Sequence, residues 1–463
     1  MATKRQKKQA YRAAKKVAKK NPTLFIILVL IILVIAGVFA FLYFTGKLDG
    51  ILNKNNTSNG SNTSNQQENI NTGEKQEDGI VENIEYKDFS IHFMELGNEF
   101  AGDSVYIKAG DVDILIDAGS RGNSSPTLTK YIDKYCKDGK LEYVIATHPH
   151  QDHIAGFAGN SDSKAKNYKG DIVGKTGIFY YYSVGTIIDF TYSDKNGTLN
   201  KEQTSATEGT STVYGKYLAA REYAISNGAN YYTAKDLWDS NNHLFNLNSN
   251  ITMDILYNYY YFNKSSDVNN YSVCTLFNYN DKNYLLTGDL EKEGEEKLSN
   301  YYDSSTKEKT LPHVELFKAG HHGSYTASNE CLLEKVAPKM CVACCCCGST
   351  EYTIDNNHIF PAQEFIDRIA KYTSRVYVTS LYDKENDKGI SMNGDVIVSS
   401  NGTDVGLFAS NNLTRLKDTS WFNADIYVVN GKVKPSSSGD FYKEGDPNVV
   451  KIKQRTWPQY GIS

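Results

Sequence analysis

A dense cluster of metal-binding side chains directly follows an apolar run, and it constrains the fold more than any other feature of this chain. Residues 141–146 read as a buried strand, and the next seven residues contain His148, His150, Asp152 and His153. The whole chain has nine histidines, so three within six residues are not a product of composition. A rigid strand that ends in such a cluster presents imidazole and carboxylate ligands to a metal ion.

The spacing within the cluster indicates two neighbouring ion sites. We predict that His148 and His150 bind one ion, and that Asp152 and His153 bind a second ion close by. Mixed nitrogen and oxygen ligands favour zinc, with manganese or iron as alternatives, over calcium or magnesium. The sequence therefore predicts one or two divalent ions, most readily zinc, with manganese possible.

Ligands from other strand ends are needed to complete such a site. Asp289 follows the apolar run 285–286 and Gly288, which is where a bridging carboxylate belongs. Residues 318–324 supply His321 and His322 after another predicted strand. Taken singly, a Gly-Asp pair is usually a turn and a histidine is usually structural, but their joint placement at predicted strand ends indicates one site.

The order of strands and helices suggests two sheets with helices outside. Strands are predicted over 91–96, 104–108, 112–117, 141–146, 184–190, 251–257, 272–278, 284–287, 314–318 and 375–379 and from 340 onward, and helices over 126–137, 214–226, 290–300, 328–336 and 362–372.

These motifs together resemble the metallo-beta-lactamase fold superfamily, and more narrowly the metallo-hydrolase domain of ComEC-type competence proteins. The resemblance covers roughly residues 86–400 and rests on the segments 115–119, 147–154, 269–272, 285–289, 320–324 and 357–361. It implies an α/β fold, an αββα sandwich with metals at the edge between the sheets.

The resemblance also implies roles for the later histidines. His321 matches the metal-ligand position, and His322 and His358 would lie near the substrate as acids or oxyanion-stabilising groups. Asp152 would bind metal and orient the attacking water. A metal lowers the pKa of water towards neutrality, so the predicted chemistry is hydrolysis of an ester, amide or phosphoester.

Three departures from the family pattern bear on the site. Residues 95–103 replace a tighter glycine-rich turn, and the multi-span channel of ComEC is absent. Between the first cluster and Asp289 the only histidine is His243, whose offset does not fit a ligand position. We therefore expect the His148/His150 side to bind metal more weakly than the Asp152/His153 side.

The N-terminal region predicts a membrane anchor. Leu24–Phe44 is an uncharged apolar run of 21 residues, long enough to cross a bilayer as a helix. The alternative is a secretory signal peptide, but its apolar core usually spans only about 7–15 residues and ends in small side chains. Residues 1–20 hold nine Lys and Arg and no acid, which places them in the cytoplasm and the remainder outside the cell.

The predicted organisation is a cytoplasmic tail (1–20), a transmembrane helix (21–45), a flexible Asn/Ser-rich linker (46–85), the hydrolase domain (86–400) and a C-terminal extension (401–463).

Residues 86–463 carry 38 basic and 47 acidic side chains, unlike the basic surface usual for nucleic-acid binders. The resemblance still favours a phosphodiester as substrate, with nucleic acid among the candidates. The alternatives are small esters or phosphoesters of the cell envelope, or a catalytically weak envelope-binding protein.

The cysteines provide a further candidate site in Cys341 and the run Cys344–Cys347. They fall where a strand is expected, and successive side chains of a strand face opposite ways, so four in a row do not converge on one ion. Small, buried side chains in a sheet core are the favoured interpretation over a thiolate metal site.

Overall fold

The computed structural model describes residues 79–98, 100–193, 199–200, 212–303, 310–345, 359–383, 388–429, 432–434 and 447–462. All of them belong to one compact unit, residues 71–463. Within these described ranges, no helix is both long and apolar enough to span a membrane. The predicted span 24–44 and the basic tail 1–20 lie outside the described residues, so the anchor stays a prediction.

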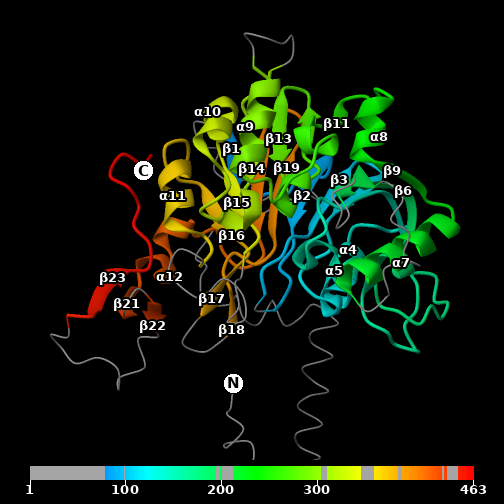
Figure 1. The fold of residues 1–463 in the computed structure, drawn as a ribbon, viewed down its shortest axis with the longest axis horizontal. Coiled ribbons are helices and arrows are strands. Elements are labelled where there is room, and N and C mark those ends of the chain that lie inside the picture. The colour runs from blue at the N-terminus through cyan, green and yellow to red at the C-terminus, as the bar shows by residue number, and fades with distance from the viewer. Residues whose placement is uncertain are drawn as a thin grey trace, which may run out of the picture. The chain divides into compact units, whose positions relative to one another are not determined.

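The larger of two main sheets contains nine strands among the described residues (Figure 1). Its hydrogen-bonded order is β1 (Ile80–Glu82), β20 (Val405–Ala409), β19 (Val396–Ser400), β2 (Phe89–Phe93), β3 (Val105–Ala109), β4 (Val112–Ile116), β5 (Lys140–Ile145), β6 (Ser183–Asp189) and β9 (Asn230–Thr233). The strands β4, β5, β6 and β9 are parallel, so their C-terminal ends share one edge of the sheet.

The second sheet has seven strands in the described ranges, in the order β10 (Leu244–Asn246), β11 (Ile251–Ile255), β12 (Thr275–Tyr279), β13 (Lys282–Leu286), β14 (Leu316–Lys318), β15 (Cys341–Ala343) and β16 (Val376–Val378). From β13 onward the pairing is parallel. The two sheets pack face to face through aromatic side chains, since the ring of Phe89 lies 5.0 Å from that of Tyr284 and 6.1 Å from that of Phe277.

Helices cover the outer faces of the two sheets (Figure 1). On the side of the first sheet lie α4 (Ser125–Ile132), α5 (Gln151–Ala158), α6 (Ile178–Tyr181) and α7 (Val213–Ser226), with α8 (Ala234–Asp239) after β9. On the second lie α9 (Lys292–Tyr301), α10 (Glu330–Val336) and α11 (Gln363–Ile369). Leu298, Leu332 and Phe365 from the latter three helices are fully buried in one cluster with Leu285 and Phe317 of the sheet. The predicted α/β fold class is therefore confirmed.

The C-terminal residues contribute to the main fold. β20 completes a hairpin with β19 inside the first sheet, so the predicted boundary at residue 400 falls within this hairpin. β1 pairs with β20, so the sheet also begins before the predicted start at residue 86. The remaining short elements are β17 (Ser380–Asp383), β18 (Lys388–Ser391), α12 (Ser420–Asn423), β21 (Asp425–Val429), β22 (Lys432–Lys434), β23 (Val449–Lys453), β7 (Tyr192–Ser193) and β8 (Leu199–Asn200), together with the 3-10 turns η1 (Gly122–Ser124), η2 (Tyr259–Tyr261), η3 (Val268–Tyr271), η4 (Gly320–Gly323) and η5 (Leu416–Asp418).

A buried glutamate on α9 fixes the loop that follows η4. The carboxylate of Glu295 accepts hydrogen bonds at 2.7 Å from the backbone amides of Ser328 and Asn329 and from the Asn329 side chain. Burial raises the pKa of Glu295 to about 7, against the lowering effect of these donors. The folded state therefore holds a proton on this group more tightly than the unfolded chain does.

This shift gives a first prediction, on the pH dependence of stability. Because the folded pKa is raised, the stability contributed by Glu295 is greatest at acidic pH and falls as the pH rises towards about 7. The free energy of unfolding of wild type relative to Glu295→Gln is expected to fall by about 3 kcal/mol between pH 4.5 and 8, as measured by urea unfolding followed by circular dichroism. The exposed Glu296→Gln is the matched control. A difference that stays constant with pH would contradict the raised pKa.

Candidate metal centre

The predicted site residues come together at the edge between the two sheets, where several strands end. The cluster after β5 continues into α5, so Asp152 and His153 lie in the first turn of a helix. Asp289 follows β13, and the histidine pair follows the neighbouring parallel strand β14. Parallel neighbours end at the same edge, which is why ligands far apart in the chain meet here.

Four imidazoles converge on one carboxylate oxygen. The Nε2 atoms of His148, His153, His321 and His322 lie 3.8, 3.0, 3.8 and 3.5 Å from Oδ2 of Asp289. All four rings are at most 8% exposed, and Asp289 is fully buried. The carboxylate therefore stands at the centre of the cluster, as a bridging ligand would.

The outer nitrogen of each of these rings has a partner of its own. His148 Nδ1 lies 3.1 Å from Thr147 Oγ1, His153 Nδ1 lies 2.7 Å from Asp117 Oδ2, His321 Nδ1 lies 2.6 Å from Glu291 Oε1, and His322 Nδ1 lies 2.9 Å from the carbonyl oxygen of Cys344. Such outer partners fix ring orientation and leave Nε2 for a metal.

The remaining members of the first cluster lie at the mouth of the same site. His150 Nδ1 is 3.2 Å from His148 Nε2, and Asp152 Oδ2 is 3.3 Å from His322 Nε2. One potential ligand atom from each of Asp152, His153, Asp289 and His322 lies within 4.8 Å of the others. This group has the nitrogen and carboxylate donors that suit a zinc-like ion.

A buried ion pair contacts one histidine of the cluster on the side away from Asp289. Lys318 Nζ, on β14, lies 2.6 Å from Oδ2 of Asp103, which precedes β3 in the other sheet. The second oxygen of Asp103 lies 3.1 Å from His322 Nδ1. The pair thus joins the two sheets directly beneath a candidate ligand.

Charges within the cluster shift the pKa values of three of its members towards their ionised forms. Burial lowers the pKa of His153, but Asp289 and Asp117 outweigh it and raise this pKa well above its usual value. Likewise, Asp289 and Asp103 outweigh burial and raise the pKa of His322 to about 10. Burial would raise the pKa of Asp289, yet His153, His322 and His321 hold it well below its ordinary range.

The donor set fits a divalent ion. Oδ1 of Asp289 is buried and accepts no hydrogen bond from the described residues, so one lone-pair site at the centre of the cluster is left for another ligand. The raised pKa values of His153, His321 and His322 favour protonated rings beside the carboxylates, and a cation would replace these protons, since metal ligands bind in the deprotonated form.

The two adjacent histidines, His321 and His322, differ in their position relative to the rest of the cluster. His321 is predicted as the metal ligand and His322 as a group near the substrate, and these roles stay predictions. In the structure His322 belongs to the group with Asp152, His153 and Asp289, and His321 lies outside it. Both residues and Gly323 have positive φ, so the turn rotates successive side chains in a way that the spacing of the residues does not reveal.

Other predicted residues lie elsewhere. His243 stacks on Trp238 at 3.9 Å and its Nδ1 contacts Asp254 Oδ1 at 2.7 Å, which accounts for it without a metal. Cys341, Cys344 and Cys345 are buried, as predicted, and form no disulfide among the described residues. Only Cys341 lies in a strand, because β15 ends at Ala343 before the predicted strand reaches the cysteine run. His358, Cys346 and Cys347 lie outside the described residues.

Several supporting residues had no predicted role. Asp117 and Lys318 stand at strand ends within the quoted motifs, and Glu291 follows Asp289 by two positions. Their signal was an acidic or basic side chain at the end of an apolar run. This pattern does not predict which histidine ring the charged side chain contacts, because the contact depends on strands that are distant in the chain.

The placement of the histidine pair leads to a second prediction. His322→Gln is expected to lower the affinity for Zn²⁺ by about 10- to 100-fold, and His321→Gln by a smaller factor, because only His322 lies in the Asp152/His153 group. Affinity is measured by competition with a chromogenic chelator, with the exposed His313→Gln as control. A larger loss of affinity in His321→Gln would support the predicted role of His321 as the metal ligand.

Comparisons with known proteins find similarity over parts of the chain. Residues 97–160, which include β3 to β5 and the first cluster, match the model described as "Metallo-beta-lactamase superfamily". No curated protein matches the chain at a significant level. Among solved structures, the chain is similar to the metallo-beta-lactamase fold protein YhfI from Bacillus subtilis, with 12% identity, a TM-score of 0.32 and coverage of 63% of this chain and 95% of that one.

Two other similar structures have comparable scores. Human tRNase Z, short form, has 12% identity and a TM-score of 0.27, and the match covers 55% of this chain and 90% of that one. A putative metal-dependent hydrolase from Parabacteroides distasonis has 13% identity and a TM-score of 0.26, and the match covers 56% of this chain and 85% of that one.

Proposed function

We propose, on the premise that this chain contains a metallo-beta-lactamase superfamily domain, that it is a metal-dependent hydrolase acting on phosphodiesters. The convergence of four Nε2 atoms on Asp289 Oδ2 carries the proposal. Asp152, His153, Asp289 and His322 would hold one ion, and His148 and His150, with Asp289 between, a second. A bound divalent ion supplies a Lewis acid and lowers the pKa of water.

The chain's own residues supply orientation and proton transfer. Asp117 holds His153, and the Cys344 carbonyl holds His322, so both rings present Nε2 to the site. Glu291 holds His321 and, with Asp289, raises its pKa against burial. His321 is therefore the group suited to protonate the leaving oxygen as water adds to phosphorus and the ester P–O bond breaks.

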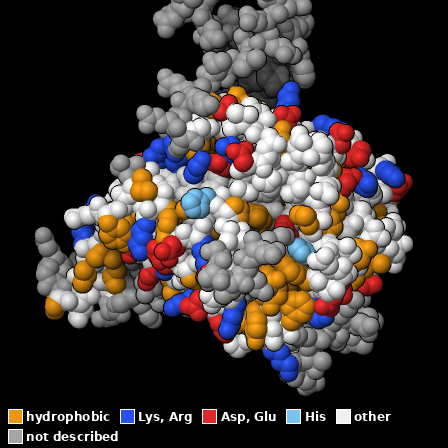
Figure 2. Space-filling model, turned by 90° about the horizontal axis from the view of Figure 1, so that it is seen from above, with side chains coloured by type: hydrophobic (Ala, Val, Ile, Leu, Met, Phe, Trp, Pro, Cys, Tyr) orange, Lys and Arg blue, Asp and Glu red, His pale blue; other side chains and the backbone are white. Residues whose placement is uncertain are grey.

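The fixed charges around the candidate metal centre are mostly negative. Among the described residues, five carboxylates lie close to the histidines, from Asp103, Asp117, Asp152, Asp289 and Glu291, and the buried ammonium of Lys318 pairs with Asp103. Metal ions would supply the positive charge that attracts a phosphodiester. On the face seen in Figure 2, the Lys and Arg side chains of the described residues are interspersed with Asp and Glu and form no continuous basic stripe of the kind that follows a nucleic-acid backbone.

A panel of substrates tests this function. Full-length protein in detergent, loaded with zinc or manganese, is assayed on bis(p-nitrophenyl) phosphate, p-nitrophenyl phosphorylcholine, single-stranded DNA and p-nitrophenyl acetate, with His150→Ala as the inactive control. We expect metal-dependent cleavage of the phosphodiesters. Faster cleavage of DNA would favour the narrower relation to the ComEC-type hydrolases, and activity on the acetate ester alone would favour an esterase. Absence of both bound metal and activity would refute the proposal.

The location of the enzyme is a separate proposal. We propose that residues 24–44 anchor it in the cell membrane, with residues 1–20 in the cytoplasm and the catalytic domain outside. Protease added to intact cells should degrade the domain and spare the N-terminal tail, and an alkaline wash should leave the protein in the membrane fraction. Protection of the domain, or its release by the wash, would contradict this topology.

A further inference from the structure

The C-terminal segment that follows β23 contains a buried arginine held by backbone carbonyls. Arg455 is 2% exposed, its Nε donates to the carbonyl oxygen of Pro361 at 2.6 Å, and an Nη donates to the carbonyl oxygen of Ile359. Its guanidinium carbon lies 5.5 Å from the centre of the Trp421 ring. The two accepting carbonyls flank Phe360 on either side, so this one side chain fixes the backbone at Phe360.

Phe360 forms a wall of the candidate metal centre. Its ring is 2% exposed and lies 5.6 Å from the ring of His321 and 5.8 Å from that of His322. The next residues brace the same turn, since the Ala362 amide donates to the Gly323 carbonyl oxygen at 2.8 Å. A Cβ built on Gly323 would lie 3.0 Å from Pro361 Cβ, so the contact there is close.

The histidine turn depends on such support. His321, His322 and Gly323 have φ values of 45°, 55° and 83°, all in the left-handed region. This conformation costs free energy in non-glycine residues and persists only where surrounding contacts impose it. Phe360 and the Ala362 amide are contacts of that kind, and Arg455 fixes the segment that supplies them.

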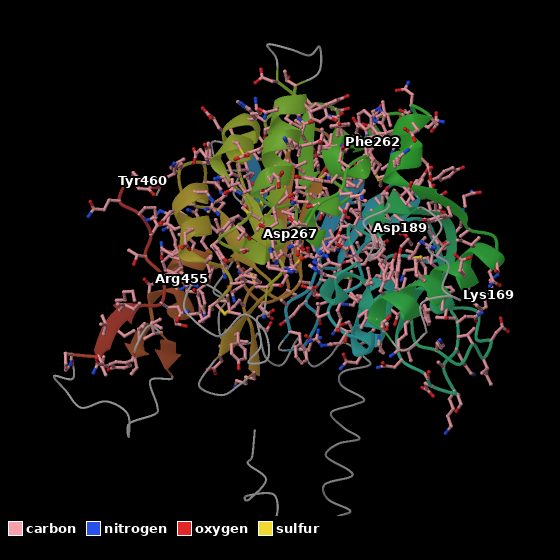
Figure 3. All side chains as sticks on the ribbon, viewed as in Figure 1. Lys169, Asp189, Phe262, Asp267, Arg455 and Tyr460 are labelled. Carbon is pink, nitrogen blue, oxygen red and sulfur yellow. The ribbon has the colours of Figure 1, made fainter. Side chains whose placement is uncertain are left out.

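Further hydrogen bonds fasten the C-terminal segment along α11. The backbone of Thr456 exchanges two hydrogen bonds with the side chain of Gln363, at 2.7 and 2.8 Å. The Tyr460 hydroxyl donates to the carbonyl oxygen of Asp367, and the Ile462 amide to that of Ala370. Figure 3 shows Arg455 near the base of α11 and Tyr460 farther along it.

We infer that Arg455 is a positioning residue for the metal centre: it sets Phe360 against the His321–His322 turn and thereby the direction of both imidazoles. The C-terminal segment is then part of the catalytic unit. This inference rests on the proposed function and deepens it. It states that the C-terminal segment, which is distant in sequence, controls the geometry of the His321–His322 side of the site.

The test uses full-length protein in detergent micelles reconstituted with Co²⁺, whose visible absorption reports ligand geometry. Arg455→Met is expected to shift the cobalt spectrum and to weaken cobalt binding about tenfold, as loss of an outer-shell partner does. Arg455→Lys should have an intermediate effect, since an ammonium lacks the planar fork that reaches both carbonyls. Lys453→Met, an exposed position two residues away, is the matched control and should leave the spectrum unchanged.

A second variant separates positioning from simple stability. Phe360→Leu should shift the cobalt spectrum in the same way, and the double variant with Arg455→Met should show less than the sum of the two effects on cobalt affinity, because both act through one ring. If Arg455→Met lowers the melting temperature but leaves spectrum and affinity unchanged, the residue is only structural and the inference is overturned.

A readout without metal keeps the two proposals distinguishable. In nitrogen-15 histidine spectra of the metal-free protein, Arg455→Met should move the signals of His321 and His322 and leave that of His92, which contacts Ser90 and Tyr131 in the first sheet. If wild type binds no cobalt, the proposed function fails, while these spectra still decide whether Arg455 positions the turn. Unchanged His321 and His322 signals would overturn the inference.

Discussion

Asp289→Asn is expected to abolish hydrolysis and to reduce metal affinity by more than about 100-fold, the upper end of the loss seen for outer-shell groups. The reason is geometric, since all four buried Nε2 atoms face this one carboxylate. The amide is similar in size but lacks the charge that a bridging ligand supplies. Metal content by mass spectrometry and cleavage of bis(p-nitrophenyl) phosphate measure the two effects.

The same substitution should be visible without any metal. Asp289 is the strongest of the groups that raise the pKa of His322 to about 10, so this pKa should fall in Asp289→Asn. Titration of the histidine signals by nuclear magnetic resonance measures it, with the exposed Asp162→Asn as control. Retention of tight metal binding in Asp289→Asn would contradict the bridging role.

Lys318→Met is expected to have the largest effect on stability. Lys318 and Asp103 are both nearly fully buried, so removal of the ammonium leaves the Asp103 carboxylate with only His322 Nδ1 as a cationic neighbour in a low-dielectric interior. Breaking a buried pair in this way costs about 3–5 kcal/mol in the free energy of unfolding. Urea unfolding of the metal-free protein, followed by circular dichroism, measures the change.

A surface pair and a double variant provide the controls for this prediction. Lys339→Met removes one of the two lysines paired with Glu315, at a site where Lys339 is 42% exposed, and it should change stability by no more than about 1 kcal/mol. Asp103→Asn in the Lys318→Met background should recover part of the loss, because no buried charge is then left unpaired. Equal costs for the two lysines would contradict a special role for the buried pair.

Strand periodicity and the density of ligand residues were sufficient to predict much of the fold and the site. The predicted strands at 112–117, 141–146 and 251–257 correspond to β4, β5 and β11, because alternating or continuous apolar runs bounded by turns are local signals. The first cluster, Asp289 and the histidine pair do meet, because parallel strands end at a common edge. The short β1 and the helical start at Gln151 were missed, since neither has a periodic pattern long enough to be recognised.

The sequence by itself determined which side chains could bind a metal and that they lie at strand ends. Only the tertiary structure decided which imidazole faces which partner. His322, and not His321, has a ligand atom in the group with Asp152, His153 and Asp289, and both histidines lie in a left-handed turn that residue spacing does not reveal. Pairing of β19 with β20 and burial of Arg455 likewise made the C-terminal residues part of the domain. These outcomes depend on contacts between segments far apart in the chain, and such contacts have no local signature.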